Sequence, residues 1–270
     1  MAVLAAFGSN CIDRYHTEAG DIAYCGGGPV NMAIAAKECG VNALYIGAVG
    51  DDAYGKKQIE AMHAHGIDTS HVTVRKGRTA VSEVTLKGNE RILGDYDAGV
   101  LEDYRMSENE MRIAAAADLC VMDLWGMQED AFVGLKQYGA LTAFDAADRP
   151  YDPVSQKVMP YTDLFFFSHD GSKEEAMAIL QDLSARGIPL AVCMRGEEGS
   201  LARDKNGLHM CGIVRCEDVV DTMGAGDSYI GAFLAWYMNG KPVEECMRKG
   251  AASAAGVLGF HGAFAGGRIQ

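Results

Sequence analysis

Basic side chains are scarce in this sequence of 270 residues, which holds 24 lysines and arginines against 37 aspartates and glutamates, a formal net charge of −13. Nucleic acids are bound through lysine- and arginine-rich surfaces, so this balance argues against DNA or RNA as the main partner. Long apolar runs are also missing, since none approaches the roughly 20 residues of a membrane span. The first seven residues are too short a run, without a basic start, for a signal peptide. We therefore expect a cytoplasmic protein with no nucleic-acid or membrane partner.

Patterns typical of zinc sites and disulfide scaffolds are missing too. The eight cysteines form no Cys-x-x-Cys pair, and the seven histidines form no His-Glu-x-x-His motif. We expect these cysteines to be reduced and mostly buried thiols.

Two phosphate motifs are incomplete. Residues 50–57 (GDDAYGKK) lack the hydroxyl of a P-loop, and residues 224–229 lack the third glycine of a dinucleotide fingerprint. A P-loop NTPase and a Rossmann dehydrogenase are therefore disfavoured.

Strand and helix signals alternate along most of the chain. This alternation indicates one α/β domain over residues 1–270, with a mostly parallel central sheet and helices on both faces. Ser107 with Glu110 and Ser172 with Glu175 have the spacing of capping boxes at helix starts. The Asn-Gly pair at 206–207 indicates a hairpin. Short β-like runs over residues 72–97 predict a small antiparallel sheet, with residues 14–25 as a further strand. Together, about 13–25 and 72–97 would form a β-sheet lid.

The loop at residues 221–228 (DTMGAGDS) leads into an apolar segment that is long enough for a helix. The first N–H groups of a helix bind anions, and Gly224 and Gly226 have no side chains to keep a phosphate away from them. A carboxylate at Asp227 would repel such an anion. Its presence is explained if it takes the proton of a hydroxyl that receives the phosphoryl group. The simpler interpretation is that Asp227 only caps the helix. Taken alone, the loop favours the capping role.

Two stretches that lie far apart in the chain resemble the two signatures of the PfkB (ribokinase-like) carbohydrate kinases. The first is residues 26–33 (GGGPVNMA), continued through Gly40 and Gly50, and the second is residues 221–227 (DTMGAGD), continued through residues 231–234 (GAFL). The resemblance spans essentially the whole chain. It implies a ribokinase-like α/β fold with a β-sheet lid, and ATP-dependent phosphorylation of a sugar hydroxyl.

The resemblance also assigns roles to matching positions. It implies that Asp227 is the base for the acceptor hydroxyl, and that the backbone of Gly224, Ala225 and Gly226 forms the anion hole for the transferred phosphoryl group. Asp13 would bind sugar hydroxyls in a pocket that is also lined by Gly27, Gly28 and Asn31. The positions that would lie along ATP are Arg195, Gly196, Gly199 and Thr222. The implied cofactors are ATP and Mg²⁺, with a monovalent cation as a further candidate.

Two positions depart from the family pattern. Many members have threonine where Met194 stands, and the family's N-x-x-E motif, which is tied to Mg²⁺, is replaced by residues 168–171 (SHDG). Glu174 and Glu175 lie nearby, but a capping role explains Glu175 better. We therefore assign no metal ligand from the sequence.

A narrower resemblance is to bacterial fructosamine kinases that act on fructoselysine. It rests on residues 8–13 (GSNCID), 94–96 (GDY), 125–126 (WG), 129–132 (EDAF) and 141–145 (LTAFD). It implies that the C6 hydroxyl of a fructosamine is phosphorylated. The lid offers Glu90, Arg91, Asp95 and Tyr96 as polar partners for the substrate, and for Arg91 and Asp95 a solvated strand edge is an equal alternative. Trp125 is either a stacking surface for the ligand or, more commonly for tryptophan, a core residue.

Two other functions stay open. One is another kinase of the family, for fructose, ribose or a nucleoside. The other is a catalytically silent sugar- or nucleotide-binding protein. By analogy with the family we expect a homodimer that forms through the β lid.

Overall fold

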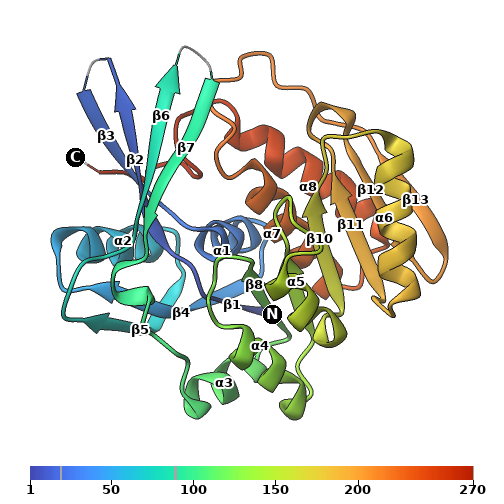
Figure 1. The fold of residues 1–270 in the computed structure, drawn as a ribbon, viewed down its shortest axis with the longest axis horizontal. Coiled ribbons are helices and arrows are strands. Elements are labelled where there is room, and N and C mark those ends of the chain that lie inside the picture. The colour runs from blue at the N-terminus through green and yellow to red at the C-terminus, as the bar shows by residue number, and fades with distance from the viewer. Residues whose placement is uncertain (19, 88–89, 270) are drawn as a thin grey trace.

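A nine-stranded sheet forms the centre of the molecule (Figure 1). The computed structural model describes residues 1–18, 20–87 and 90–269, without the side chains of 86–87 and 90–93. Within this part the strand order is β13-β12-β11-β10-β9-β8-β1-β4-β5. The strands are β1 Val3–Phe7, β4 Asn42–Gly50, β5 Asp68–Arg75, β8 Leu119–Asp123, β9 Thr142–Asp145, β10 Leu164–Ser168, β11 Leu190–Met194, β12 Ser200–Asp204 and β13 Gly207–Cys211. Only the pairings made by β12 are antiparallel, which confirms the mostly parallel sheet predicted from the sequence.

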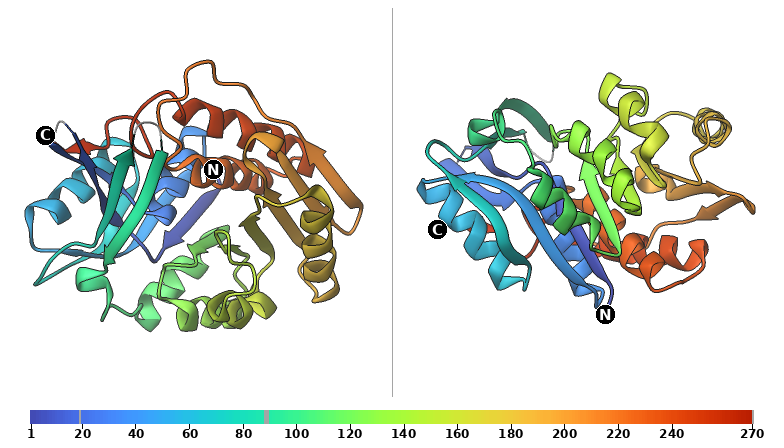
Figure 2. Two further views of the ribbon diagram at one scale, coloured as in Figure 1. Left: turned by 45° about the horizontal axis from the view of Figure 1, so that its top comes forward. Right: turned by 90° about the horizontal axis from the view of Figure 1, so that it is seen from below.

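Helices cover both faces of this sheet, as Figure 2 shows. One face carries α1 Gly28–Glu38, α2 Ala53–Ala64, α7 Ala225–Met238 and α8 Val243–Val257, and the other carries α3 Glu108–Ala115, α4 Glu129–Leu135, α5 Pro153–Val158 and α6 Lys173–Ala185. Alternate strand residues face opposite ways. On β10, Phe166 packs under α7, where its ring centroid lies 5.3 Å from that of Phe233, while Phe165 belongs to the core under the other helices. Each such buried side chain contributes about 1.5–3 kcal/mol.

Local signals in the sequence place several element ends correctly. Both predicted capping boxes form, at Ser107 with Glu110 before α3 and at Ser172 with Glu175 before α6. The predicted hairpin forms: Asn206 lies in the turn and Gly207 begins β13, where it pairs with Asp204 of β12. No helix in the described part of the chain is long and apolar enough to cross a membrane.

A second, five-stranded sheet lies at one end of the molecule (Figure 1). Its order is β14-β3-β2-β6-β7, with β14 Arg268–Ile269, β3 Gly20–Gly26, β2 Cys11–Thr17, β6 Val81–Lys87 and β7 Glu90–Asp97. We call this sheet the lid.

The lid differs from the sequence prediction in three ways. Residues 14–25 are not one strand, because β2 and β3 form a hairpin. The lid is mixed rather than antiparallel, because β2 pairs with β6 in parallel. Residues 72–75 belong to β5 in the central sheet, where Val72 pairs with Gly47 of β4. Helix α2 connects these two strands, and a helical crossover brings the chain back parallel to the strand before it.

Candidate active site

The loop before α7, which we call the cradle, leaves the start of the helix open at Gly226. Gly224 is the N-cap of α7 in the left-handed conformation, with φ 73° and ψ 2°, and a Cβ there would lie 2.5 Å from Cβ of Ala263. Only glycine fits both constraints. A Cβ on Gly226 would have Met194 as its nearest neighbour, with Cε 3.8 Å away, so the approach to Gly226 is open. The first-turn N–H groups of a helix have no acceptor within the helix and are free to bind an anion.

Asp227 lies in the first turn of α7, directly beside this cradle. Its Oδ2 accepts a hydrogen bond of 2.8 Å from Nδ2 of Asn31, which lies in α1 and is 4% exposed. This bond joins the two stretches that resemble family signatures. Since Gly224 is the N-cap of α7, Asp227 does not occupy the capping position that the simpler interpretation gave it.

The glycine run at the start of α1 passes close to polar groups of other strands. Gly27 has φ 105°, and a Cβ there would overlap Cα of Asn10. A Cβ on Gly28 would lie 2.6 Å from Oδ2 of Asp123 and 3.4 Å from Oδ1 of Asp227. The predicted pocket residues Gly27, Gly28 and Asn31 therefore do lie together, close to Asp227.

Four aspartates meet around this point. Asp13 on β2 is 5% exposed and accepts a hydrogen bond of 3.6 Å from Sγ of Cys11. Asp123 ends β8 and is 4% exposed, and it pairs in register with Asp145 at the end of β9. With Asp227 they form what we call the acidic cluster: Asp13, Asp123, Asp145 and Asp227. The carboxyl ends of neighbouring parallel strands meet at one edge, which is where ligands bind in open α/β sheets.

Charge and burial in the cluster shift several pKa values. Burial raises the pKa of Asp123 to about 7, a hydrogen bond from Ser9 opposes that shift, and the charge of Asp227 adds to it. Burial and the charges of Asp227 and Asp123 raise the pKa of Asp145 well above its usual value. Burial, followed by Asp13, Asp123 and Asp227, also raises the pKa of Cys11, so this thiol is not a nucleophile.

Asp123 was not among the predicted site residues, and neither was its partner Ser9, whose Oγ donates to Oδ2 of Asp123 at 2.6 Å. Asn10 was not predicted either, and it holds the chain here by donating to the Tyr45 hydroxyl and to the carbonyl of Ala48, both at 2.9 Å. One signal was available. Asp123 and Asp145 each end a predicted apolar strand, and ligand sites form at such ends.

The predicted nucleotide residues make different kinds of contact. Arg195 is buried, and its Nη2 donates to the carbonyl of Gly171 at 3.0 Å, so its side chain ties together two loops of the protein. Gly199 has φ 82°, and a Cβ there would overlap the carbonyl of Cys211. Gly196 and Thr222 are exposed and open to a ligand.

Among the lid residues predicted as polar partners of the substrate, Tyr96 lies near the acidic cluster. The side chains of Glu90 and Arg91 lie outside the described residues, and Asp95 is exposed. The next residue, Tyr96, has its pKa raised by burial of the hydroxyl and by Cys11, Asp123 and Asp13. Although 45% of Tyr96 is exposed, its hydroxyl therefore lies near the acidic cluster.

Trp125 is not a core residue. It is 46% exposed, and the guanidinium carbon of Arg149 lies 5.1 Å from its ring centroid. The more common core role of tryptophan is therefore wrong here. The ring follows β8 directly after the end that carries Asp123, where it is accessible to a ligand.

The residues that replace the family's metal motif do not form a metal site. Within residues 1–18, 20–87 and 90–269 there is no group of three acidic, histidine or cysteine side chains that could hold a metal ion. Glu175 is already used in its capping box, where Oε2 accepts from the N–H of Ser172 at 2.8 Å.

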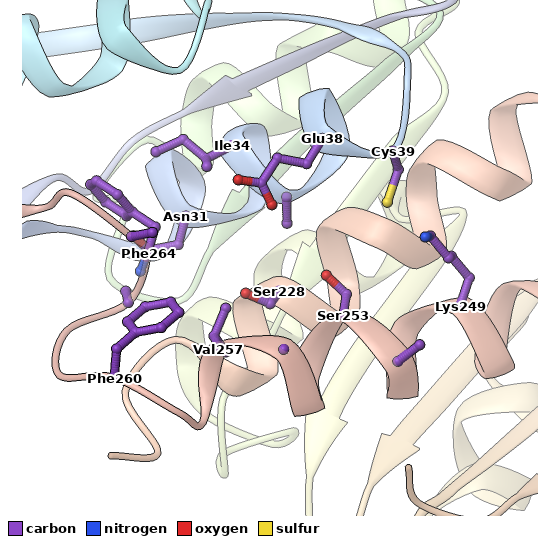
Figure 3. A pocket seen from close by; sticks show the side chains of 15 residues that line it. Asn31, Ile34, Glu38, Cys39, Ser228, Lys249, Ser253, Val257, Phe260 and Phe264 are labelled. Atoms are coloured by element: carbon purple, nitrogen blue, oxygen red, sulfur yellow. The ribbon is translucent and has the colours of Figure 1, made fainter. Parts of the chain in front are cut away.

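A separate cavity of about 360 Å³ lies between α1, α7 and α8 (Figure 3). Asn31 and Ser228 form part of its wall, while Glu38, Cys39 and Lys249 lie near its other end. No aspartate of the acidic cluster lines it. Asn31, in its wall, is the residue that donates to Asp227.

Solved structures share this fold along nearly the whole chain. The ribokinase of Arabidopsis thaliana complexed with ribose and ATP superposes with a TM-score of 0.85 and 21% identity, over 97% of this chain and 95% of that one. The adenosine kinase of Sinorhizobium meliloti superposes with a TM-score of 0.82 and 22% identity, over 97% of this chain and 95% of that one. At these identities the likeness establishes the ribokinase-like α/β fold.

Sequence relatives are more specific. The chain is 36% identical over 264 residues to the fructoselysine 6-kinase of Shigella flexneri, covering 98% of this chain and 100% of the relative. It is 27% identical to the fructosamine kinase FrlD of Bacillus subtilis, and the match covers 97% of this chain and 92% of that relative. The model of the pfkB family carbohydrate kinases matches residues 4–266. The chain therefore belongs to the pfkB family of carbohydrate kinases.

Proposed function

We propose that this ATP-dependent carbohydrate kinase phosphorylates the C6 hydroxyl of a fructosamine, with fructoselysine as its substrate. The catalytic part rests on one observation: a carboxylate, Asp227, held by Asn31 at 2.8 Å beside an open helix start. The substrate part rests on the relatives named fructoselysine 6-kinase and fructosamine kinase, which align over nearly the whole chain.

In the proposed reaction Asp227 accepts the proton of the C6 hydroxyl as its oxygen attacks the γ-phosphorus of ATP. The bond from that phosphorus to the bridging oxygen of ADP breaks, so ADP leaves and the sugar becomes a 6-phosphate. The N–H groups at Gly224, Ala225 and Gly226 stabilise the negative charge of the transferred group. Asp13 and Asn31 orient the sugar, and Gly27 and Gly28 bring the backbone close to Asn10 and Asp123 beside it.

The nucleotide is proposed to lie along Gly196, Gly199 and Thr222, with Arg195 supporting the loops from behind. When bound, Mg²⁺ supplies positive charge to the phosphates. It takes most of its ligands from phosphates and waters, with one or two carboxylates at most. A monovalent cation is a further proposal, which is tested by comparing turnover in potassium with turnover in tetramethylammonium.

Two other functions compete with this proposal: another sugar or nucleoside kinase of the family, and a silent binding protein. A panel of acceptors separates them, with ADP release measured for fructoselysine, fructose, ribose and adenosine. We expect the highest kcat/KM for fructoselysine. If the enzyme preferred fructose, ribose or adenosine, that acceptor would replace fructoselysine as the proposed substrate. Thermal stabilisation by ligands without ADP release from any acceptor would favour the silent binding protein.

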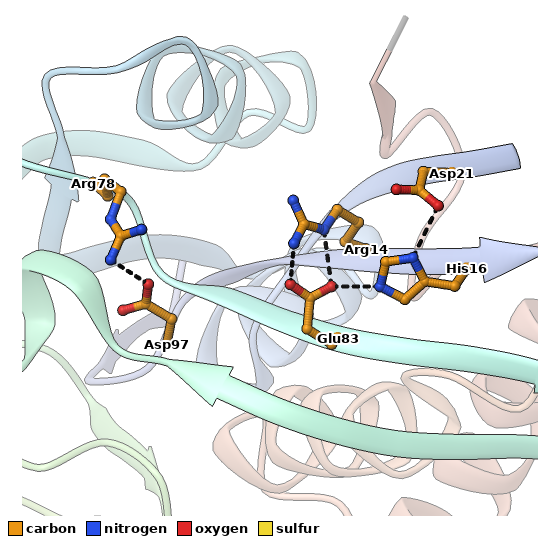
Figure 4. A network of polar contacts seen from close by, with 6 residues as sticks. All are labelled: Arg14, His16, Asp21, Arg78, Glu83 and Asp97. Atoms are coloured by element: carbon orange, nitrogen blue, oxygen red, sulfur yellow. Dashed lines mark hydrogen bonds and ion pairs between the residues drawn. The ribbon is translucent and has the colours of Figure 1, made fainter.

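A cytoplasmic homodimer formed through the lid is also proposed. β7 is an edge strand of the lid, and an open edge can pair with another chain. The neighbouring face of β2 and β6 is polar, since Glu83 bonds to both Arg14 and His16, and His16 also bonds to Asp21 (Figure 4). Light scattering after gel filtration tests the dimer. The eight thiols, all free, fit a reducing compartment.

A further inference from the structure

The loops that follow β8 and β9 bring an exposed tryptophan and an arginine together. Trp125 comes two residues after Asp123, the last residue of β8, and Arg149 comes four residues after the end of β9. The guanidinium carbon of Arg149 lies 5.1 Å from the ring centroid of Trp125, within cation–π distance. Trp125 is 46% exposed and the side chain of Arg149 55%. Both are therefore open to a ligand at the carboxyl edge of the sheet, which carries the acidic cluster.

The backbone of Trp125 is fixed to the proposed active site. Its N–H donates to the carboxylate of Asp123, and the N–H of Gly126 donates to the carbonyl of Asp123 at 3.1 Å. A Cβ on Gly28 would lie 2.6 Å from Oδ2 of Asp123 and 3.4 Å from Oδ1 of Asp227, so these two carboxylates are neighbours. Trp125 is therefore bonded to an acidic side chain that lies next to the proposed base.

Both loops are held in a backbone conformation that most residues avoid. Within the described part of the chain, the residues other than glycine with positive φ are Met127, at 51°, and Ala147, at 50°. Each lies two residues from one member of the Trp125–Arg149 pair. Asp145 holds Ala147 in place, since its Oδ1 accepts from the N–H of Ala147 at 3.0 Å. Such conformations cost free energy and are found mostly at active sites and ligand-binding loops.

Arg149 has N–H donors left for an acidic ligand. Its ion-pair partner among the described residues is the preceding Asp148, at 3.6 Å and itself 77% exposed, and such a surface pair is weak. Two other arginines are already bound: Arg195 donates to a backbone carbonyl, and Arg14 donates to Glu83. A guanidinium that stacks on an aromatic ring can present its planar fork to a carboxylate. The pair therefore offers an apolar surface and a cationic fork side by side.

The proposed substrate needs both features. In fructoselysine the C6 hydroxyl and the amino acid lie at opposite ends of the molecule, so a substrate with C6 at Asp227 carries its lysine part away from the base. An alkyl chain and an α-carboxylate then remain to be bound. The acidic cluster repels that carboxylate, whereas Arg149 attracts it.

We propose that Trp125 and Arg149 bind the amino-acid part of the fructosamine, with the alkyl chain against the Trp125 ring and the α-carboxylate on the Arg149 guanidinium. This inference rests on the proposed function and assigns two specificity-determining residues to it. Asp227 acts on the C6 hydroxyl, while the pair distinguishes a fructosamine made from an amino acid from one made from a simple amine.

The test uses two substrates that differ only in the carboxylate: fructoselysine and its decarboxylated analogue, fructose joined to cadaverine. The wild-type enzyme should prefer fructoselysine in kcat/KM by roughly 5–30-fold, between the values for exposed ion pairs and for hydrogen bonds to charged groups. Arg149→Met should remove this preference and change kcat/KM for the analogue by no more than about twofold. Arg149→Lys, which keeps the charge but not the fork, should retain part of the preference.

Arg112→Met is the matched control, because Arg112 of α3 lies over the ring of Tyr138 at the same distance of 5.1 Å. It should leave the preference unchanged. An equal loss on both substrates in Arg149→Met would overturn the inference, and so would a wild-type enzyme that phosphorylates both equally well. A wild-type enzyme that phosphorylates neither compound would overturn the proposed function itself.

Fluorescence quenching reports on the Trp125 ring directly. The chain has two tryptophans, so Trp236→Phe leaves Trp125 as the single one. Fructoselysine should make the ring less accessible to acrylamide, whereas fructose, which lacks the alkyl chain, should leave its accessibility the same. Protection by both sugars, or by neither at concentrations that saturate turnover, would overturn the inference and leave the proposed function intact.

Discussion

The hydroxyl of Tyr15, in the lid, donates a hydrogen bond of 2.7 Å to Oδ2 of Asp221, 206 positions away. Asp221 begins the anion loop, and its two oxygens also accept from the N–H groups of Met223 and Gly262, both at 3.0 Å. One buried carboxylate therefore joins the lid, the cradle and the segment that packs against Gly224. The lid is tied to the loop that is proposed to hold the phosphoryl group.

Removing the hydrogen bond between Tyr15 and Asp221 should destabilise both the lid and the loop before α7. In Tyr15→Phe, Asp221 loses one of its donors while staying buried, which costs about 1–3 kcal/mol of unfolding free energy. We also expect a higher KM for the sugar. Tyr24→Phe is the control, since its ring packs edge-on at 5.1 Å from that of Tyr15, whereas no hydrogen bond of its hydroxyl is seen within the described residues. Denaturant melts and sugar kinetics measure both effects, and equal behaviour of the two variants would exclude a role for the Tyr15–Asp221 bond.

Asp227→Asn should fold normally and lose turnover. The amide keeps an oxygen that can accept from Asn31, but it cannot take a proton from the acceptor hydroxyl. We expect a decrease in kcat of roughly 10²–10⁴-fold. The melting temperature and its increase with added ATP should stay close to wild type. Turnover near the wild-type value would remove Asp227 from the mechanism.

Gly28→Ala tests the space between the two carboxylates. The new Cβ would lie 2.6 Å from Oδ2 of Asp123, so that carboxylate must move. Since a misplacement of about 1 Å costs roughly 10²-fold in rate, we expect a loss of that order in kcat/KM. Gly259→Ala is the control, because a Cβ there meets nothing within 4 Å. If the two variants had the same kinetics, the substrate would not pass Gly28.

His209 should make stability depend on pH. Partial burial disfavours its charge, but hydrogen bonds with Asp204 at 2.8 Å and Glu244 at 2.7 Å outweigh this and raise its pKa above 6.5. A histidine with a raised pKa stabilises the fold fully below its unfolded pKa of about 6.5, and this stability is lost as pH rises through the folded pKa.

The measurement is the melting temperature of wild type and His209→Gln between pH 5.5 and 9, on the order of half-unit steps. The wild-type advantage should be largest at the acid end and shrink toward pH 9. Glu244→Gln should reduce it, because one of the two carboxylate partners is lost. A constant difference across this range would show that only packing at His209 matters.

The sequence alone determined the layered α/β fold and the catalytic centre of the proposed site. Alternating apolar strands and capped helices depend on neighbours along the chain, so their order predicted a parallel sheet covered on both faces. Glycines at 27 and 224 are demanded by local backbone geometry and close approach, and such positions leave a visible pattern. Asp227, three residues after Gly224, was assigned through the family resemblance of these glycine-rich stretches.

Only the tertiary structure decided what surrounds Asp227. Asp123, Asp145 and Tyr96 come from three strands, β8, β9 and β7, and the sequence does not show that these strands bring them together. They meet because β8 and β9 are neighbours whose carboxyl ends share one edge, with the lid folded toward that edge. This dependence on distant segments also explains why residues 72–75 of β5 were predicted to lie in the lid. Packing between distant segments decides which strands pair, and a local sequence pattern does not contain that information.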